Sequence, residues 1–123
     1  MTALRIMMMP RDTNHAGTIF GGVILSHIDQ AGYVEARKHG TTRWVTVALD
    51  RVEFLQPVMV GDIVEFQTRT LAVGRTSVTV GVEVIAERRH SGERVEVTRA
   101  RLVMVSVDES GNATPHGAES GGS

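Results

Sequence analysis

The chain has 123 residues, enough for one domain with its own core and too few for two. Its formal net charge of −1 gives no sign of nucleic acid or an anionic membrane as a partner. Cysteine is absent, which excludes disulfides, thiolate metal sites and a cysteine nucleophile, and fits a reducing compartment. No apolar stretch approaches the roughly 20 residues that span a bilayer, so we expect a soluble, cytoplasmic protein.

The first forty residues predict a strand, a loop and one long helix. Residues 1–10 are apolar but lack a long apolar run and a cleavage site, so we interpret them as an edge strand and not a signal peptide. The loop of residues 10–18 leads to a helix of about five turns, which opens at Gly21-Gly22 and stops at Gly40. Its buried line is expected at Ile24, Ile28, Ala31 and Glu35.

The remainder predicts long antiparallel strands. Val45, Val47 and Leu49 alternate, and the phase then slips by one residue, which predicts a bulge near Asp50 and Arg51. Further strands are expected from Val64 to a turn at Gly74, from Val78 to Ala86, and from Arg94 to Val107 after a turn at Gly92.

This order predicts an α+β fold with one helix against a highly curved antiparallel sheet of five to six strands. The last strand is apolar on both faces around Leu102, so a second subunit is expected to cover part of the face that the helix leaves open. We expect the domain to span residues 1–107. Residues 108–123 are rich in Gly, Ser and Glu, which predicts a flexible polar tail.

Asp29 demands an explanation, because a carboxylate in the middle of an apolar helix is costly unless it is paired or solvated in a cleft. The structural alternative places it on an exposed stripe with Ser26 and Tyr33. Gly21 and Gly22 favour a chemical role, because the free N–H groups at a helix start can hold an oxyanion. Gly-Gly pairs also serve tight packing or a turn, so periodicity leaves both readings open.

Other chemical signals are weaker. Asp12 is interpreted as a turn former or helix cap, and Asn14 either does the same or orients a water or a carbonyl group. The five histidines form no pattern of metal ligands, and His27 is poorly phased with Asp29. No serine-nucleophile elbow or phosphate-binding glycine loop is present. Basic residues near two predicted turns, Arg75 and the pair Arg88-Arg89, are either solvated strand ends or phosphate contacts.

Four segments in order carry a family resemblance. They are PRDTNHAGTIFGGVILSHIDQAG, VTVALDRVEFLQPVMVGD, VGRTSVTVGVEV and VTRARLVMVSVD. Together they resemble the acyl-CoA hydrolases of the hotdog superfamily, particularly the bacterial YciA-like thioesterases and the cytosolic brain-type acyl-CoA hydrolases. The resemblance covers about residues 4–108. The chain departs from many relatives in its short polar tail, where they continue with structured residues.

The resemblance implies a homodimer with a continuous sheet, two active sites at the interface, and assembly of such dimers into hexamers. Asp29 stands at the catalytic carboxylate, Asn14 at a residue that acts across the interface, and Gly22 with Gly21 at the helix start that polarises the thioester carbonyl. The strand Val45-Thr46-Val47 would run beside the pantetheine arm. The expected contacts of the CoA nucleotide and phosphates are Gly74, Arg75, Thr76, Ser77, Arg88 and Arg89.

The sequence hypothesis is therefore hydrolysis of acyl-CoA to a free acid and CoA, with no metal or redox cofactor, since CoA is part of the substrate. Asp29 would act as general base toward water or as nucleophile. A hotdog hydratase or dehydratase is one alternative, and a non-catalytic acyl-CoA-binding protein is another. The acyl pocket is expected near Val23, Tyr33 and Phe54.

Overall fold

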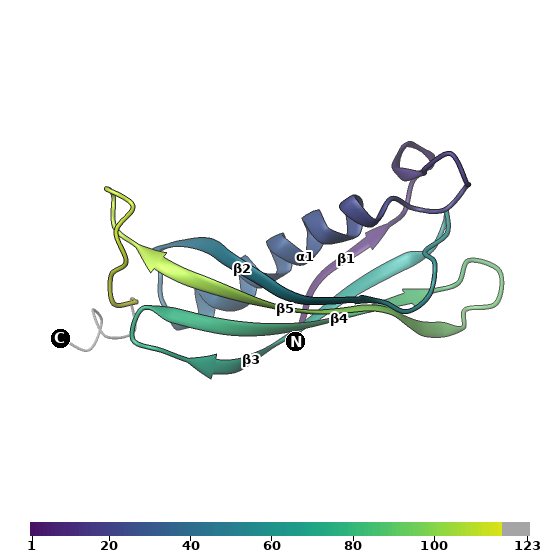
Figure 1. Ribbon diagram of the computed structural model, residues 1–123. Helices are drawn as coiled ribbons and strands as arrows, with labels where there is room; N and C mark the ends of the chain where they lie inside the picture. The colour runs from purple at the N-terminus through teal and green to yellow at the C-terminus, as the bar shows by residue number, and fades with distance from the viewer. Residues whose placement is uncertain (117–123) are drawn as a thin grey trace.

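The computed structural model describes residues 1–116, and residues 117–123 lie outside the described part. One helix, α1 (Gly21–Ala36), lies across one face of a five-stranded antiparallel sheet (Figure 1). The strands are β1 (Thr2–Met7), β2 (Arg43–Phe54), β3 (Ile63–Val73), β4 (Ser77–Glu87) and β5 (Arg94–Val107). They are ordered β1-β3-β4-β5-β2, so β1 and β2 form the two edges of the sheet. The predicted α+β architecture is confirmed.

Most element bounds follow the sequence pattern closely. β5 begins and ends where the alternation predicted, and Gly92 in the turn before it has a positive φ of 72° that favours glycine. The helix begins at Gly21 as expected. After Ala36 it continues for one tighter turn, Arg37–His39, so the predicted five turns are four of α-helix followed by one of 3-10 helix.

Strand β2 holds one predicted bulge and one that was not predicted. The register with β5 shifts between Leu49 and Arg51, which confirms the bulge at Asp50. It also shifts between Thr46 and Ala48, so Val47 is a second bulge. The expectation that Val45, Val47 and Leu49 share one face is therefore wrong, because an extra residue reverses the side on which every later side chain lies. Thr46 now shares a face with Met104 and Leu49 with Leu102.

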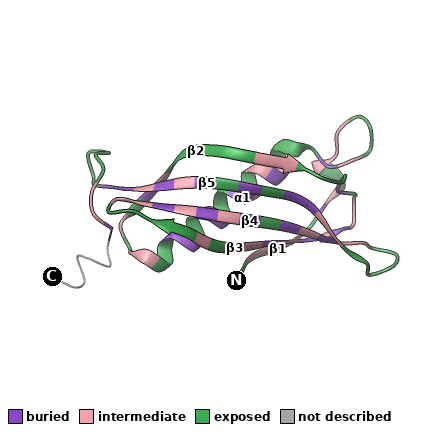
Figure 2. Ribbon diagram, turned by 60° about the horizontal axis from the view of Figure 1, so that its bottom comes forward, coloured by how far each residue is buried: buried purple, intermediate pink, exposed green. Residues whose placement is uncertain are grey.

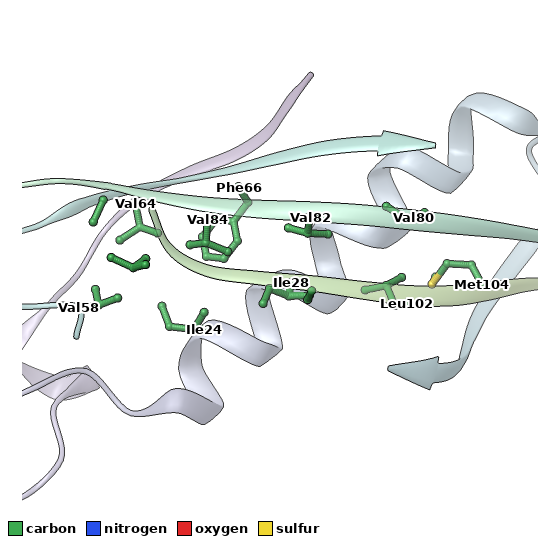
Figure 3. Close-up of a cluster of buried hydrophobic side chains, with 14 of the residues drawn as sticks. Ile24, Ile28, Val58, Val64, Phe66, Val80, Val82, Val84, Leu102 and Met104 are labelled. Carbon is green, nitrogen blue, oxygen red and sulfur yellow. The ribbon is translucent and has the colours of Figure 1, made fainter. Parts of the chain in front are cut away.

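Buried residues lie along α1 and along the strands that it covers (Figure 2), and their side chains form the core between the helix and the sheet. Ile24 and Ile28 point from the helix toward valines of the sheet and Leu102 (Figure 3). Gly32 makes the closest approach: a Cβ at this position would lie 2.5 Å from Leu102 Cδ1. The missing side chain lets the helix settle directly onto β5.

The polar segment after β5 folds back on the sheet end as far as the structure describes it. Ala113 forms an isolated bridge with Val107. His116 is buried, donates from Nε2 to the Gly74 carbonyl oxygen at 2.8 Å, and stacks on Trp44 with ring centroids 5.7 Å apart. These contacts were not foreseen for a flexible tail. The rest of that predicted tail lies outside the described residues, and the division at residue 107 stays a prediction.

Glu35 is a buried carboxylate on the helix line that the sequence marked as internal. Thr68 donates to its Oε1 at 2.8 Å and Thr70 to its Oε2 at 2.7 Å, while Lys38 Nζ lies 3.1 Å from Oε1. His39 Nε2 completes the network with a 2.8 Å bond to Thr70. Burial raises the pKa of Glu35, but the bonds from Thr70, Thr68 and Lys38 together outweigh burial and leave it lowered from 4.5.

Replacing Glu35 with Gln should lower the free energy of unfolding at pH 7 by about 1–3 kcal/mol, because the hydroxyl donors lose a charged acceptor. A lowered folded-state pKa means that ionised Glu35 stabilises the fold above its unfolded pKa, and that this contribution is lost as pH falls through the folded value. Denaturant unfolding from pH 7 to about 3 should therefore show the gap to the wild type narrowing. Glu109→Gln, an exposed control, should show no gap, and a Glu35→Gln gap that is independent of pH would contradict the assignment.

Candidate active site

Asp29 meets the edge strand β2 through a side-chain hydrogen bond. The hydroxyl of Thr46 donates to Asp29 Oδ1 and also lies 3.1 Å from Met104 Sδ. Asp29 Oδ2 has no hydrogen-bond partner within residues 1–116. In a single chain Asp29 is exposed, on the stripe with Ser26 and Tyr33 that the structural alternative described. The carboxylate is thus held at one oxygen and open at the other.

An open cleft of about 630 Å³ surrounds this carboxylate. Helix α1 and the start of β2 supply most of its wall, with one residue each from β1 and β5. Its lining residues are Leu4, Asp29, Gln30, Tyr33, Val34, Trp44, Val45, Thr46 and Met104. A concave, mostly apolar surface with a few convergent polar groups is the usual form of a small-molecule site.

The start of α1 is open to solvent and has no side-chain cap. Gly21 and Gly22 are exposed, and their N–H groups have no acceptor within the described residues. A Cβ on Gly22 would meet nothing within 4 Å, whereas one on Gly21 would lie 3.4 Å from Phe54 Cζ. Two free N–H groups at the positive end of the helix dipole can hold a developing negative charge.

Asn14 is engaged within its own loop. Its Oδ1 accepts from the N–H of Ala16 at 2.9 Å and of Thr18 at 3.2 Å, and its Nδ2 donates to the Thr18 hydroxyl at 2.9 Å. Asp12 accepts from the Met9 N–H at 3.0 Å, so its interpretation as a turn former holds. No hydrogen bond joins Asn14 to Asp29 within the described chain. A single chain therefore leaves Asn14 outside the cleft.

The two predicted groups of CoA contacts lie at opposite ends of β4 (Figure 1). Gly74, Arg75, Thr76 and Ser77 form or flank the turn before it, and Arg88 and Arg89 follow it. Eleven residues of strand separate the two turns by about 35 Å. One chain does not bring both groups to one ligand.

Arg88 forms a structural ion pair. Its Nη1 lies 2.6 Å from Asp62 Oδ2 and 3.0 Å from the Pro57 carbonyl oxygen. Asp62 is only 2% exposed and also accepts from the Met59 N–H at 2.9 Å. Arg89 packs its aliphatic stem against Gly61, which has a positive φ of 88°. This network holds the loop that the sequence showed as FLQPVMVGD.

Sequence reasoning missed the bond between Thr46 and Asp29, because only the tertiary fold joins a mid-helix carboxylate to an edge strand. The phase slip in β2 was the available signal for an unusual strand here. A hydratase would need a histidine paired with the carboxylate, and His27, which the sequence showed to be poorly phased with Asp29, uses Nδ1 for the Val23 carbonyl oxygen at 2.9 Å and packs on Phe66. It is thus turned away from a pairing with Asp29, and the hydratase alternative gains no support.

Comparison with known proteins matches the arrangement to one family. Residues 16–93 match the model of the thioesterase superfamily. The acyl-CoA thioester hydrolase YciA of Escherichia coli K12 is 40% identical over 111 residues, which are 88% of this chain and 84% of that protein. A hexameric hotdog-fold thioesterase of Campylobacter jejuni has a TM-score of 0.90 and 44% identity, over 96% of this chain and 91% of that one.

This chain belongs to the hotdog-fold acyl-CoA thioesterases. A further family member, an acyl-CoA hydrolase of Staphylococcus aureus solved with butyryl coenzyme A and coenzyme A, is 28% identical with a TM-score of 0.84, over 93% of this chain and 70% of that one. The family resemblance read from the sequence is confirmed. In the present chain, no helix within residues 1–116 has the length and apolarity that a bilayer crossing requires.

For this member of the thioesterase family, Arg88→Ala should lower the free energy of unfolding by about 3 kcal/mol or more, because it leaves the buried Asp62 carboxylate unpaired. Chemical denaturation measures the loss. Arg75→Ala, in an exposed turn, is the matched control and should unfold like the wild type. Equal stability of the Arg88 and Arg75 variants would show that the ion pair contributes little.

Proposed function

We propose that the chain hydrolyses acyl-CoA to a free carboxylic acid and CoA, with Asp29 as the reacting carboxylate. The observation that carries the proposal is the hydrogen bond from Thr46, which fixes one oxygen of Asp29 and leaves the other facing an open cleft. Membership of the acyl-CoA thioesterase family supplies the substrate class.

Two routes fit this carboxylate. As general base, Asp29 takes a proton from water while the water oxygen bonds to the thioester carbon; the C–S bond then breaks, and the CoA thiolate receives a proton. As nucleophile, Asp29 forms a mixed anhydride and expels the thiolate, and water then cleaves the anhydride. In both routes the carbonyl oxygen becomes negative. The free N–H at Gly22 is proposed to stabilise it.

The distance between the two groups indicates that a complete site needs two chains. Gly22 and Asp29 are seven residues apart in α1, which places them roughly 10 Å apart along the axis. A reacting carbon has to lie about 3 Å from both the attacking group and the oxyanion donor. We therefore propose that Gly22 of one subunit serves Asp29 of the other in a homodimer.

Strand β2 provides the surface for that dimer. Among the described residues it has a neighbour on one side only, β5, and its outer edge is free. Val47 is 59% exposed and Leu49 is 40% exposed along this edge. Pairing of two β2 edges would bury these side chains, extend the sheet across both chains, and bring each α1 beside its copy.

The dimer also gives a role to the residues that one chain leaves apart. Asn14, on the loop before α1, would reach the Asp29 cleft of the partner. The two ends of β4 would likewise serve one CoA from different chains, with Gly74, Arg75, Thr76 and Ser77 from one turn and Arg88 and Arg89 from the other. Val45, Thr46 and Val47 would line the pantetheine arm. Assembly into hexamers, as in the relatives, and a cytoplasmic location complete the proposal.

Asp29→Asn keeps the shape of the side chain and removes the base or nucleophile. Thiol release from a panel of acyl-CoAs should fall about 10²- to 10⁴-fold in kcat. Asp108→Asn makes the same chemical change at an exposed turn after β5 and should keep the wild-type rate. Undiminished hydrolysis by Asp29→Asn would contradict the assignment. CoA-dependent thermal stabilisation of a wild type that turns over no acyl-CoA would favour the non-catalytic alternative.

Subunit mixing tests the shared site. In a mixed dimer of Asp29→Asn and Asn14→Ala chains, one site carries both lesions and the other carries neither, provided that the two residues come from different chains. Coexpression of the two inactive variants should then restore about a quarter of the wild-type activity. Asn14→Asp keeps an acceptor for the Ala16 N–H and so preserves this contact of the loop. It is the control for loss of activity through unfolding of the loop. No rescue would place both residues in one chain.

A further inference from the structure

Trp44 is the largest side chain in the wall of the cleft around Asp29. Its Nε1–H donates to the Gly40 carbonyl oxygen at 3.2 Å, and the imidazole of His116 stacks on its ring at an interplanar angle of 28°. Thr46, which bonds to Asp29, follows Trp44 by two residues in β2, so their side chains lie on the same face of the strand. The position of Trp44 therefore bears on the position of the reacting carboxylate.

His116 lies in the segment after β5 that folds back on the end of the sheet. The Thr114 N–H anchors this segment by donating to the Ser106 carbonyl oxygen at 2.8 Å. Ser106 is also the direct partner of Trp44 across β5 and β2. The anchor thus brings the segment to the strand pair that carries the cleft, where both stacked rings are buried, Trp44 at 4% exposure and His116 at 5%.

The same imidazole reaches the turn between β3 and β4. Its Nε2 lies 2.8 Å from the Gly74 carbonyl oxygen, and because a carbonyl oxygen can only accept, this nitrogen carries the proton of the neutral ring. The Gly74 N–H in turn donates to the Ser77 carbonyl oxygen at 2.8 Å and closes the turn. Gly74 and Ser77 belong to the group proposed to contact the CoA nucleotide. One side chain therefore touches both the wall of the cleft and the turn proposed for CoA.

We infer that His116 is a positioning residue of the thioesterase site: its ring holds Trp44 in the wall of the cleft, and its Nε2–H fixes the Gly74 turn relative to that wall. The inference rests on the proposed hydrolase function and adds a residue to that site. Nδ1 of His116 is buried without a hydrogen-bond partner within residues 1–116, which costs stability. Phenylalanine would avoid that cost, but it would supply the ring without the donor.

Two substitutions separate the two contacts. His116→Phe keeps a ring for Trp44 and removes the donor to Gly74, so KM for acyl-CoA should rise about three- to tenfold with kcat near the wild-type value. His116→Gln keeps a side-chain N–H for Gly74 and removes the ring. It should lower kcat about three- to tenfold with KM near the wild-type value, because Trp44 and the neighbouring Thr46 lose their fixed position.

The emission of Trp44 reports the stacking contact without any turnover, because Trp44 is the only tryptophan of the chain. His116→Gln should shift the emission to longer wavelength as the indole gains contact with water, while His116→Phe should keep the wild-type wavelength. Val84→Ala removes buried methyl groups of β4 outside the cleft and is the control for destabilisation. It should keep the emission, kcat and KM of the wild type.

The outcomes separate the inference from the function on which it rests. Unchanged kcat and KM in both folded His116 variants overturn the positioning role and leave the hydrolase proposal standing, even if the emission shifts. Equal losses in these variants and in Val84→Ala also overturn the role, because the effect then follows general destabilisation. If one His116 variant does not fold, the other still tests its own contact. Failure of the folded wild type to cleave any acyl-CoA overturns both proposals.

Discussion

The close packing of α1 on β5 determines where the chemical groups of this protein lie. Gly32 allows the helix backbone to approach Leu102 more closely than any side chain would permit, and Ile24 and Ile28 fix its rotation by pointing into the sheet. Asp29 follows Ile28 by one residue, about 100° further around the helix, which turns it toward the edge strand. Thr46 can bond to it only because the helix lies at this depth and rotation.

A second brace holds the start of the helix. The loop between β2 and β3 bonds to the segment that leads into α1: the Ile19 N–H donates to the Val58 carbonyl oxygen and the Met8 N–H to that of Asp62, both at 2.9 Å. The buried pair of Asp62 and Arg88 fixes this loop. Arg88, which the family resemblance assigns to CoA, thus helps to hold the free N–H groups of Gly21 and Gly22 in place.

The sequence predicted those parts of the fold that depend on local periodicity. Alternation located β4 and β5, and the phase slip located the bulge at Asp50. The bulge at Val47 escaped because Val45, Val47 and Leu49 look regular when read alone. At the site, Asp29 and Gly22 were found as candidates, but the Thr46 partner depends on tertiary packing. The placement of Asn14 away from Asp29 depends on the path of a loop that local rules leave undetermined.

Under the proposed dimer, the outer edge of β2, which has no neighbour among the described residues, would serve both catalysis and solubility. From Val45 to Leu49 this edge carries no charge and no proline, the devices by which proteins keep exposed strands from pairing with unrelated chains. A copy of the same chain that covers this edge would protect the molecule from aggregation. A substitution that weakens the contact would therefore show first as precipitation, before any slow turnover could be measured. Selection against aggregation would then preserve the edge even where the demand for catalysis is weak.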